Sequence, residues 1–340
     1  MESELRALHF QLTRNCNLRC AMCGQWGSHG YQRGRQFEAE LAKEDWFRIL
    51  DEVRFLASRI TLWGGEPLLA PHCLEVARHA RFRGFRVDLV TNGVLLASLA
   101  AGIDDLFETI FISVDGSPGV HDKIRGVAGT FDAIEAGIVA LRAACPRQRL
   151  AIKTTLVRDN MADLAALAGI IRRWTVDQWF IDPQMFLSAQ RQRDYSAFQE
   201  SHGVGEATAE SWRADFPPAY GAKCAEAIRA LLDGNADLPV QFGVEGLQAG
   251  DLAPWFDVPD RDLVERCCRA PHRRLSIQST GETAFCLDIT DGSFGNVRKA
   301  SALAIFHSEQ AERFRRDVAA GRNPACLRCV WKWNCFGEGA

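Results

Sequence analysis

The chain has 340 residues, 47% of them hydrophobic, which is enough for one large domain with a sizeable core and a smaller domain beside it. Its formal net charge of −3 predicts no broad attraction to nucleic acid or to an anionic membrane. No signal peptide is visible at the start, and no apolar run reaches the roughly 18 residues of a membrane-spanning helix. We therefore expect a soluble, cytoplasmic protein whose clustered cysteines are metal ligands or catalytic groups rather than structural disulfides.

The first half of the chain alternates short, β-branched apolar runs with longer segments of helical spacing. The predicted strands are 7–13, 59–63, 86–91, 109–114, 150–157 and 178–186. The predicted helices between them are 42–57, 72–83, 95–100, 130–144 and 161–173. Such repeats, with right-handed crossovers, predict an α/β fold whose parallel sheet either curls into a full or partial barrel or stays open and doubly wound. In either case the loops after the strands should carry the chemistry.

Three cysteines follow the first predicted strand directly. Cys16, Cys20 and Cys23 form a CxxxCxxC pattern, and closely spaced thiolates are typical ligands of an iron–sulfur cluster. Three thiolates leave one iron of a four-iron cluster open to an outside ligand. Zinc is the alternative, but structural zinc prefers four closed ligands and usually paired CxxC motifs.

This loop resembles the signature of the radical S-adenosylmethionine superfamily. The resemblance implies that S-adenosylmethionine chelates the open iron of a [4Fe-4S] cluster and is cleaved reductively to methionine and a 5′-deoxyadenosyl radical. After the second strand, Gly64, Gly65, Glu66 and Pro67 are similar to the family's GGEP segment, which binds the amino group of the cosubstrate. Glycines let backbone carbonyls approach an ammonium group, and a carboxylate adds a charge-assisted hydrogen bond. On its own, the tetrapeptide could be a simple turn.

The ends of the third and fourth strands extend the resemblance. Asn92 ends one strand, Ser113 and Asp115 end the next, and Arg125 follows in the segment 121–126. This succession is similar to the subgroup that includes anaerobic sulfatase-maturing enzymes and peptide maturases, and it implies that these four residues bind the cofactor. Ser113 would contact the ribose or the carboxylate, and Arg125 would pair with the methionyl carboxylate. A surface ion pair is the alternative for Arg125.

The region 191–265 is less regular and predicts a bridge between domains, with one helix at 222–233. Residues 274–286 then predict a β-hairpin around Gly281, and a helix follows near 308–320. Three further cysteines, Cys73, Cys145 and Cys224, lie in or beside predicted helices and are expected to be buried thiols.

A second cysteine pattern lies near the C-terminus. It consists of Cys268, Cys286, Cys326, Cys329 and Cys335. The spacing resembles the SPASM pattern, in which a cysteine precedes a G-xxxx-C hairpin and a CxxC-xxxxx-C run follows. Two cysteines of a full SPASM domain are absent, so the resemblance implies one auxiliary [4Fe-4S] cluster, as in the shortened Twitch version. Five cysteines are available for the four ligand positions of that cluster, and Cys267, next to Cys268, is a further possible ligand. The alternative is a zinc knuckle made by Cys326, Cys329, Cys335 and one partner.

Together these motifs imply a partial (β/α)6 TIM-like barrel at 1–190, a helical bridge at 191–265, and a small C-terminal iron–sulfur domain of SPASM/Twitch type at 266–340. The expected activity is that of a radical enzyme of oxidoreductase type, reduced by a flavodoxin or ferredoxin. Because the chain begins close to its first strand, we expect no leader-recognition domain and therefore a small-molecule substrate, such as a sugar, a cyclitol or a natural-product intermediate. Candidate lining residues are Lys153, Thr155, Asp182, Gln184 and Met185. The alternatives are a peptide or protein maturase and a non-catalytic iron–sulfur electron carrier or sensor.

Overall fold

The computed structural model describes residues 3–27, 29–33, 39–103, 105–201, 209–243, 247–262, 268–286 and 294–329. Its centre is one nine-stranded sheet in the order β7-β6-β5-β4-β3-β2-β1-β8-β9. The strands are β1 (Ala7–Gln11), β2 (Arg59–Trp63), β3 (Arg86–Thr91), β4 (Thr109–Ser113), β5 (Arg149–Leu156), β6 (Gln178–Pro183), β7 (Val240–Phe242), β8 (Arg274–Ile277) and β9 (Thr283–Ala284). Neighbouring strands are parallel except for β8 and β9.

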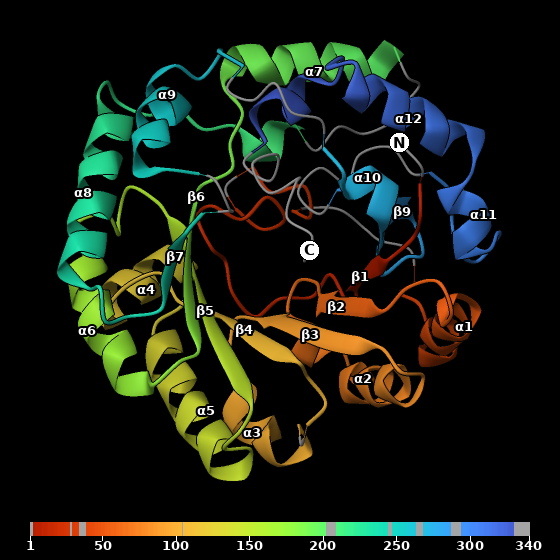
Figure 1. The fold of residues 1–340 in the computed structure, drawn as a ribbon, viewed down its shortest axis with the longest axis horizontal. Helices are drawn as coiled ribbons and strands as arrows, with labels where there is room; N and C mark the ends of the chain where they lie inside the picture. The colour runs from red at the N-terminus through yellow and green to blue at the C-terminus, as the bar shows by residue number, and fades with distance from the viewer. Residues whose placement is uncertain are drawn as a thin grey trace.

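The six predicted strands are confirmed and pair in chain order, which is the arrangement of a partial (β/α) barrel. Helices surround the curved sheet as an outer layer (Figure 1). The helices of the described ranges are α1 (Lys43–Val53), α2 (Cys73–Phe82), α3 (Leu96–Leu99), α4 (Pro118–Arg125), α5 (Thr130–Ala144), α6 (Leu164–Trp174), α7 (Ala189–Ser201), α8 (Tyr220–Gly234), α9 (Leu252–Asp257), α10 (Ala270–Arg273), α11 (Ala302–Phe306) and α12 (Glu309–Ala319). Of these, α10 lies inside the ring, beside β9 (Figure 1). None of the helices within the described ranges is long and apolar enough to cross a bilayer.

Periodicity explains which face each element buries. In α1, Trp46, Ile49, Leu50 and Val53 recur at helical spacing and are all buried. In β1, Leu8 and Phe10 face the helices and are fully buried, so the alternate residues of the strand face the inside of the barrel. The main core therefore lies between the sheet and its outer layer of helices, and the inner face carries both polar and aromatic residues.

Several elements differ from the sequence prediction. The bridge region contains α7 and α9 besides the expected helix, which is α8. Tyr195 and Gln199 are the buried side chains of α7, so that helix shows little apolar periodicity in the sequence. Residues 118–125 form helix α4, which begins with Pro118 and ends at Gly126 in the left-handed region (φ 74°). The short segment carries too few apolar residues for its periodicity to stand out. The bridge region also adds strand β7 to β6, although three residues are too short to be read from an apolar pattern.

The predicted hairpin around Gly281 is confirmed as β8 and β9. However, β8 also pairs in parallel with β1, with Leu275 opposite Leu8, so the C-terminal segment extends the barrel sheet itself. Further contacts reinforce this closure: the Glu4 backbone donates to the His272 carbonyl (2.9 Å), and Arg48 donates to the Val297 carbonyl (2.8 Å). The proposed domain boundaries at 190 and 265 remain predictions.

Candidate functional site

The first cysteine motif forms a compact loop at the carboxyl end of β1. The backbone N–H of Cys23 donates to the Cys20 carbonyl (3.1 Å), and that of Gly27 donates to the Cys23 carbonyl (2.7 Å). Burial raises the pKa of Cys16 to about 11, with smaller contributions from Cys20 and Cys23. The three thiols are therefore electrostatic neighbours in one partly buried loop, and a bound metal would displace their protons.

This donor set fits an iron–sulfur cluster. Among the described residues, no three His, Cys, Asp or Glu side chains converge on a point where a single metal ion would sit. The thiolates of a cubane cluster bind different irons and need not converge in that way. Cys16, Cys20 and Cys23 are the described thiols of this loop that could hold such a cluster.

Helix α4 holds this loop from the side. The backbone N–H groups of Arg19 and Ala21 donate to the carbonyls of Arg125 (3.0 Å) and Ile124 (2.9 Å). A side chain at Gly126 would put its Cβ 2.6 Å from the Arg19 carbonyl oxygen, so glycine is required there both for its positive φ and for close approach.

The Gly64–Pro67 segment packs against the chain just before Cys16. Gly65 donates to the Thr13 carbonyl and Glu66 donates to the Asn15 carbonyl, both at 2.7 Å. A Cβ on Gly65 would lie 2.2 Å from the Asn15 carbonyl oxygen, closer than atoms can approach. The glycine therefore lets two motifs separated by about 50 residues in sequence form one site, as predicted from their order along the sheet.

Glu66 is buried beneath this junction, with 1% of its surface exposed. Its carboxylate accepts hydrogen bonds from Thr91 Oγ1 (2.7 Å), from the Asn92 backbone (2.7 Å) and from the Leu68 backbone (3.1 Å). Burial raises its pKa to about 7 even though these hydrogen bonds favour the ionised form. Asn92 in turn donates from Nδ2 to Asn17, so it joins β3 to the cysteine loop.

Asp115 and Arg125 form a buried ion pair, which replaces the surface pair considered for Arg125. Arg125 Nε lies 2.7 Å from Asp115 Oδ2, with side-chain exposures of 11% and 0%. The same guanidinium donates from Nη1 to Cys20 Sγ at 3.7 Å. Asp115 Oδ1 accepts from the Thr155 backbone (2.9 Å), so the pair connects β5, α4 and the cysteine loop. Whether Arg125 also contacts a cofactor carboxylate remains a prediction.

The predicted lining residues of β5 and β6 are partly brought together. Lys153 Nζ lies 3.1 Å from Asp182 Oδ2 and 5.8 Å from the centre of the Phe180 ring. Register places Ser113 opposite Lys153, and Thr155 opposite Asp182. Gln184 uses its carbonyl to accept a hydrogen bond from the Trp255 indole (3.4 Å), and Met185 is half-buried beside it.

The C-terminal cysteines lie in two places. Cys268 and Cys286 flank the β8–β9 hairpin, while Cys326 and Cys329 lie at a 3-10 helix (Pro324–Arg328) whose first turn is capped by Asn323; all four are partly exposed. Cys267 and Cys335 lie outside the described residues. The three other cysteines, Cys73, Cys145 and Cys224, are buried as expected.

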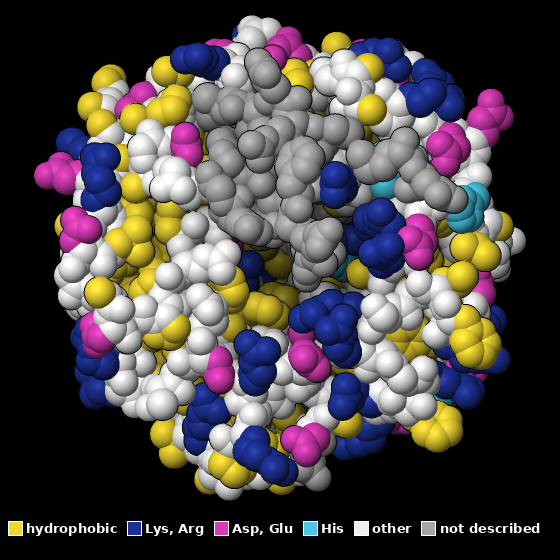
Figure 2. Space-filling model, in the orientation of Figure 1, with side chains coloured by type: hydrophobic (Ala, Val, Ile, Leu, Met, Phe, Trp, Pro, Cys, Tyr) yellow, Lys and Arg dark blue, Asp and Glu magenta, His cyan; other side chains and the backbone are white. Residues whose placement is uncertain are grey.

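The sequence reading missed the polar residues on the inner face of β1 and its neighbours. His9 and Gln11 alternate with the buried Leu8 and Phe10, which is the signal that could have identified them. Figure 2 shows the molecule hollowed near its centre, with hydrophobic and Lys or Arg side chains at the edge of the hollow.

Comparison with known proteins gives two family matches. The Radical SAM superfamily model matches residues 10–169, and the SPASM iron–sulfur cluster-binding domain matches residues 267–330. These families carry a [4Fe-4S] cluster with S-adenosylmethionine and auxiliary iron–sulfur binding, respectively.

Among curated proteins, the chain is 34% identical over 173 residues to an AdoMet-dependent heme synthase of Methanosarcina barkeri, covering 48% of this chain and 46% of that protein. It is 22% identical over 366 residues to a tungsten-containing aldehyde ferredoxin oxidoreductase cofactor-modifying protein of Pyrococcus furiosus, and this match covers 97% of this chain and 89% of that protein. The matches to the heme synthases and similar relatives thus span about half of each protein's length. Among solved structures, Streptococcus suis SuiB bound to the precursor peptide SuiA matches with a TM-score of 0.66 at 13% identity, covering 96% of this chain and 71% of SuiB.

Proposed function

We propose that this chain, which belongs to the radical S-adenosylmethionine superfamily, abstracts a hydrogen atom from a small molecule and oxidises or rearranges it. The observation that carries the proposal is the meeting of Cys16–Cys23, Gly64–Pro67, Asn92 and the Asp115–Arg125 pair at the carboxyl ends of β1 to β4. When bound there, a [4Fe-4S] cluster and S-adenosylmethionine supply one-electron reductive cleavage and hydrogen abstraction from an unactivated carbon.

The residues of the chain have distinct roles in this proposal. Cys16, Cys20 and Cys23 hold the cluster, and the Gly64–Pro67 segment receives the amino group of the cosubstrate. Glu66 supports that segment electrostatically from below, because its carboxylate is fixed by the Leu68, Thr91 and Asn92 donors. Such preorganisation reduces the reorganisation needed when the cosubstrate binds.

The C-terminal cysteines are the proposed ligands of one auxiliary cluster. Cys268, Cys286, Cys326 and Cys329 would supply four thiolates, with Cys335 competing for a place. A second one-electron centre favours a net oxidation, because it offers a place for the electron that remains on the substrate after hydrogen loss. The external reductant would be a small flavodoxin or ferredoxin.

The test is anaerobic reconstitution, iron counting and an assay for 5′-deoxyadenosine with dithionite and S-adenosylmethionine. Two four-iron clusters predict about eight irons in the wild type and about four in the Cys16→Ala/Cys20→Ala/Cys23→Ala variant, which should form no deoxyadenosine. Cys145→Ala is the matched control, because this buried thiol lies away from both motifs and its loss should change neither count. If the fully loaded wild type does not bind S-adenosylmethionine, the proposal is wrong.

A peptide substrate is the second candidate, because the structural neighbour SuiB binds a precursor peptide. The two candidates differ in what transfers hydrogen to deoxyadenosine. Deuterium transfer from a labelled peptide, with none from deuterated small metabolites, would favour the peptide maturase.

A further inference from the structure

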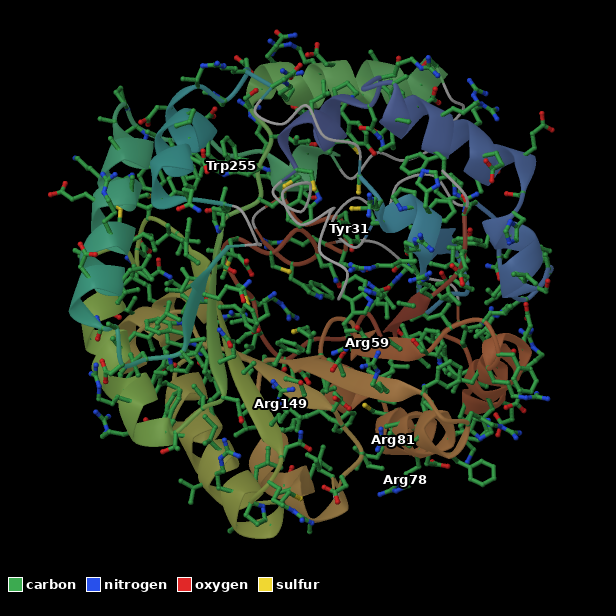
Figure 3. The ribbon with its side chains drawn as sticks, viewed as in Figure 1. Tyr31, Arg59, Arg78, Arg81, Arg149 and Trp255 are labelled. Atoms are coloured by element: carbon green, nitrogen blue, oxygen red, sulfur yellow. The ribbon has the colours of Figure 1, made fainter. Side chains whose placement is uncertain are left out.

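The inner face of β4, β5 and β6 is open to solvent. Along β5, Lys153 and Thr155 are partly exposed, whereas Ile152 and Thr154 are buried. The same alternation occurs in β4 and β6, and helices α5 and α6 lie outside these strands (Figure 1). Strand β5 can be followed from Arg149, its first residue, which Figure 3 labels. The partly exposed residues therefore form a wall on the barrel side of the sheet that a small molecule can reach.

Lys153 and Asp182 form an ion pair on this wall. Lys153 Nζ lies 3.1 Å from Asp182 Oδ2, and the two side chains are 30% and 16% exposed. Water therefore reaches both charged groups, and a ligand can replace that water. An ammonium group offers several N–H donors and a carboxylate offers several acceptor positions, so one ion pair leaves hydrogen-bonding capacity on each side chain.

An apolar surface lies directly beside the pair. Register places Phe180 of β6 opposite Lys153, and the ammonium nitrogen lies 5.8 Å from the centre of that ring. Phe111 of β4 lies next to Phe180, with 6.0 Å between the ring centres, and both residues are partly exposed. The wall thus combines two polar groups with aromatic carbon, which suits a compact carbon skeleton that carries hydroxyl groups.

The pair lies beside the proposed cosubstrate site rather than within it. Thr155 is opposite Asp182 in the register, and its backbone N–H donates to Asp115 Oδ1 (2.9 Å). Neighbouring strands are about 4.8 Å apart, so β6 lies roughly 10 Å along the sheet from β4. The residues proposed to bind the cosubstrate follow β1 to β4. The wall of β5 and β6 is therefore left for the molecule from which hydrogen is taken.

The charged atoms of the pair are spaced like the two oxygens of a vicinal diol. One hydroxyl would donate to the Asp182 carboxylate while its neighbour accepts from the Lys153 ammonium, so both hydrogen bonds involve a charged group. Hydroxyl groups on opposite sides of a ring are too far apart to contact the pair in this way. A single ionic group on the ligand would gain little, because it would meet one attractive and one repulsive charge.

We propose that Lys153 and Asp182, with Phe180 beside them, form a substrate subsite that binds a vicinal diol. The subsite rests on the proposed function for its meaning, because it lies next to the cosubstrate residues. It narrows the substrate class from any small molecule to one with hydroxyl groups on neighbouring carbons.

Two cyclohexanediols that differ only in the position of one hydroxyl group test the proposal. Saturation-transfer NMR on the anaerobically reconstituted protein would measure the dissociation constants of trans-cyclohexane-1,2-diol and trans-cyclohexane-1,4-diol. The 1,2-diol should bind at least about tenfold more tightly, as expected when one hydrogen bond to a charged group is gained.

Substitutions then locate this preference. Lys153→Met should lower it to about twofold or less, because the donor is lost while the length of the side chain is kept. Lys153→Arg should retain most of the preference, because it keeps a cationic donor. Lys43→Met is the matched control, since Lys43 pairs with Glu75 (2.7 Å) on helices outside the barrel. The 1,4-diol is an internal reference, because a general loss of structure would weaken the binding of both diols.

The outcomes separate this subsite from the proposed function. If the wild type binds neither diol, or binds both equally, the subsite is wrong even when deoxyadenosine is formed. The same holds if Lys43→Met loses the preference as fully as Lys153→Met does. If the preference is present and depends on Lys153, but the loaded protein fails to bind S-adenosylmethionine, the subsite stands and the radical function fails.

Discussion

The Asp115–Arg125 pair offers the sharpest test of how the site is held together. Both side chains are buried, and the pair connects the cysteine loop to β5 through the Cys20 sulfur and the Thr155 backbone. Removing one partner of a buried ion pair leaves an uncompensated charge and costs about 3–5 kcal/mol. Arg125→Met should therefore lower the free energy of unfolding by about that amount.

Changing both partners should lower the free energy of unfolding by much less than the sum of the two single changes. Asp115→Asn keeps an acceptor for the Thr155 N–H while removing the charge, so Arg125→Met/Asp115→Asn leaves no buried ion behind. We expect a coupling energy of at least about 2 kcal/mol in the double-mutant cycle, measured by urea unfolding of the cluster-free protein with circular dichroism. Lys123→Gln is the matched control on the same helix, because its ion pair with Asp159 is exposed and should contribute no more than about 1 kcal/mol. Additivity of the two single changes within about 0.5 kcal/mol would refute the reasoning.

Three further predictions follow from the same site. Arg125→Gln should lower the reduction potential of the N-terminal cluster, because a cation beside Cys20 stabilises the reduced cluster, and Asp115→Asn should raise that potential. Redox titration followed by electron paramagnetic resonance measures both potentials. Shifts of the same sign in the two variants would contradict this reasoning. Gly65→Ala should reduce iron loading, because its Cβ would collide with the Asn15 carbonyl oxygen. Gly119→Ala in α4 is the control and should leave iron loading unchanged, because a Cβ there meets open space. Equal iron counts in the two variants would show that the close approach at Gly65 is not needed for the site. Binding of S-adenosylmethionine by the loaded protein should weaken as pH falls through about 7, because Glu66 then takes up a proton and loses its attraction for the ammonium group. If the same pH dependence persists in Glu66→Gln, a group other than Glu66 causes it.

The amino-acid sequence by itself determined the parallel strands of the first half and the place of the chemistry. Short β-branched runs separated by helical segments predicted six parallel strands, and all six are present. The CxxxCxxC and GGEP motifs follow β1 and β2, so their proximity follows from strand adjacency alone. These features are local patterns of fixed spacing, which a linear reading can detect.

Only the tertiary structure decided the contacts between distant segments. Pairing of β8 with β1 brings Ser276 to His9 across 267 positions, and no local pattern specifies that register. Arg125 is buried, and it contacts Asp115 and Cys20, because of where α4 packs against the cysteine loop. The sequence shows which residues are charged or polar, but packing decides whether a polar atom has a hydrogen-bond partner. Hydrogen bonding and desolvation depend on distances between atoms of different segments, and those distances are fixed only in the folded chain.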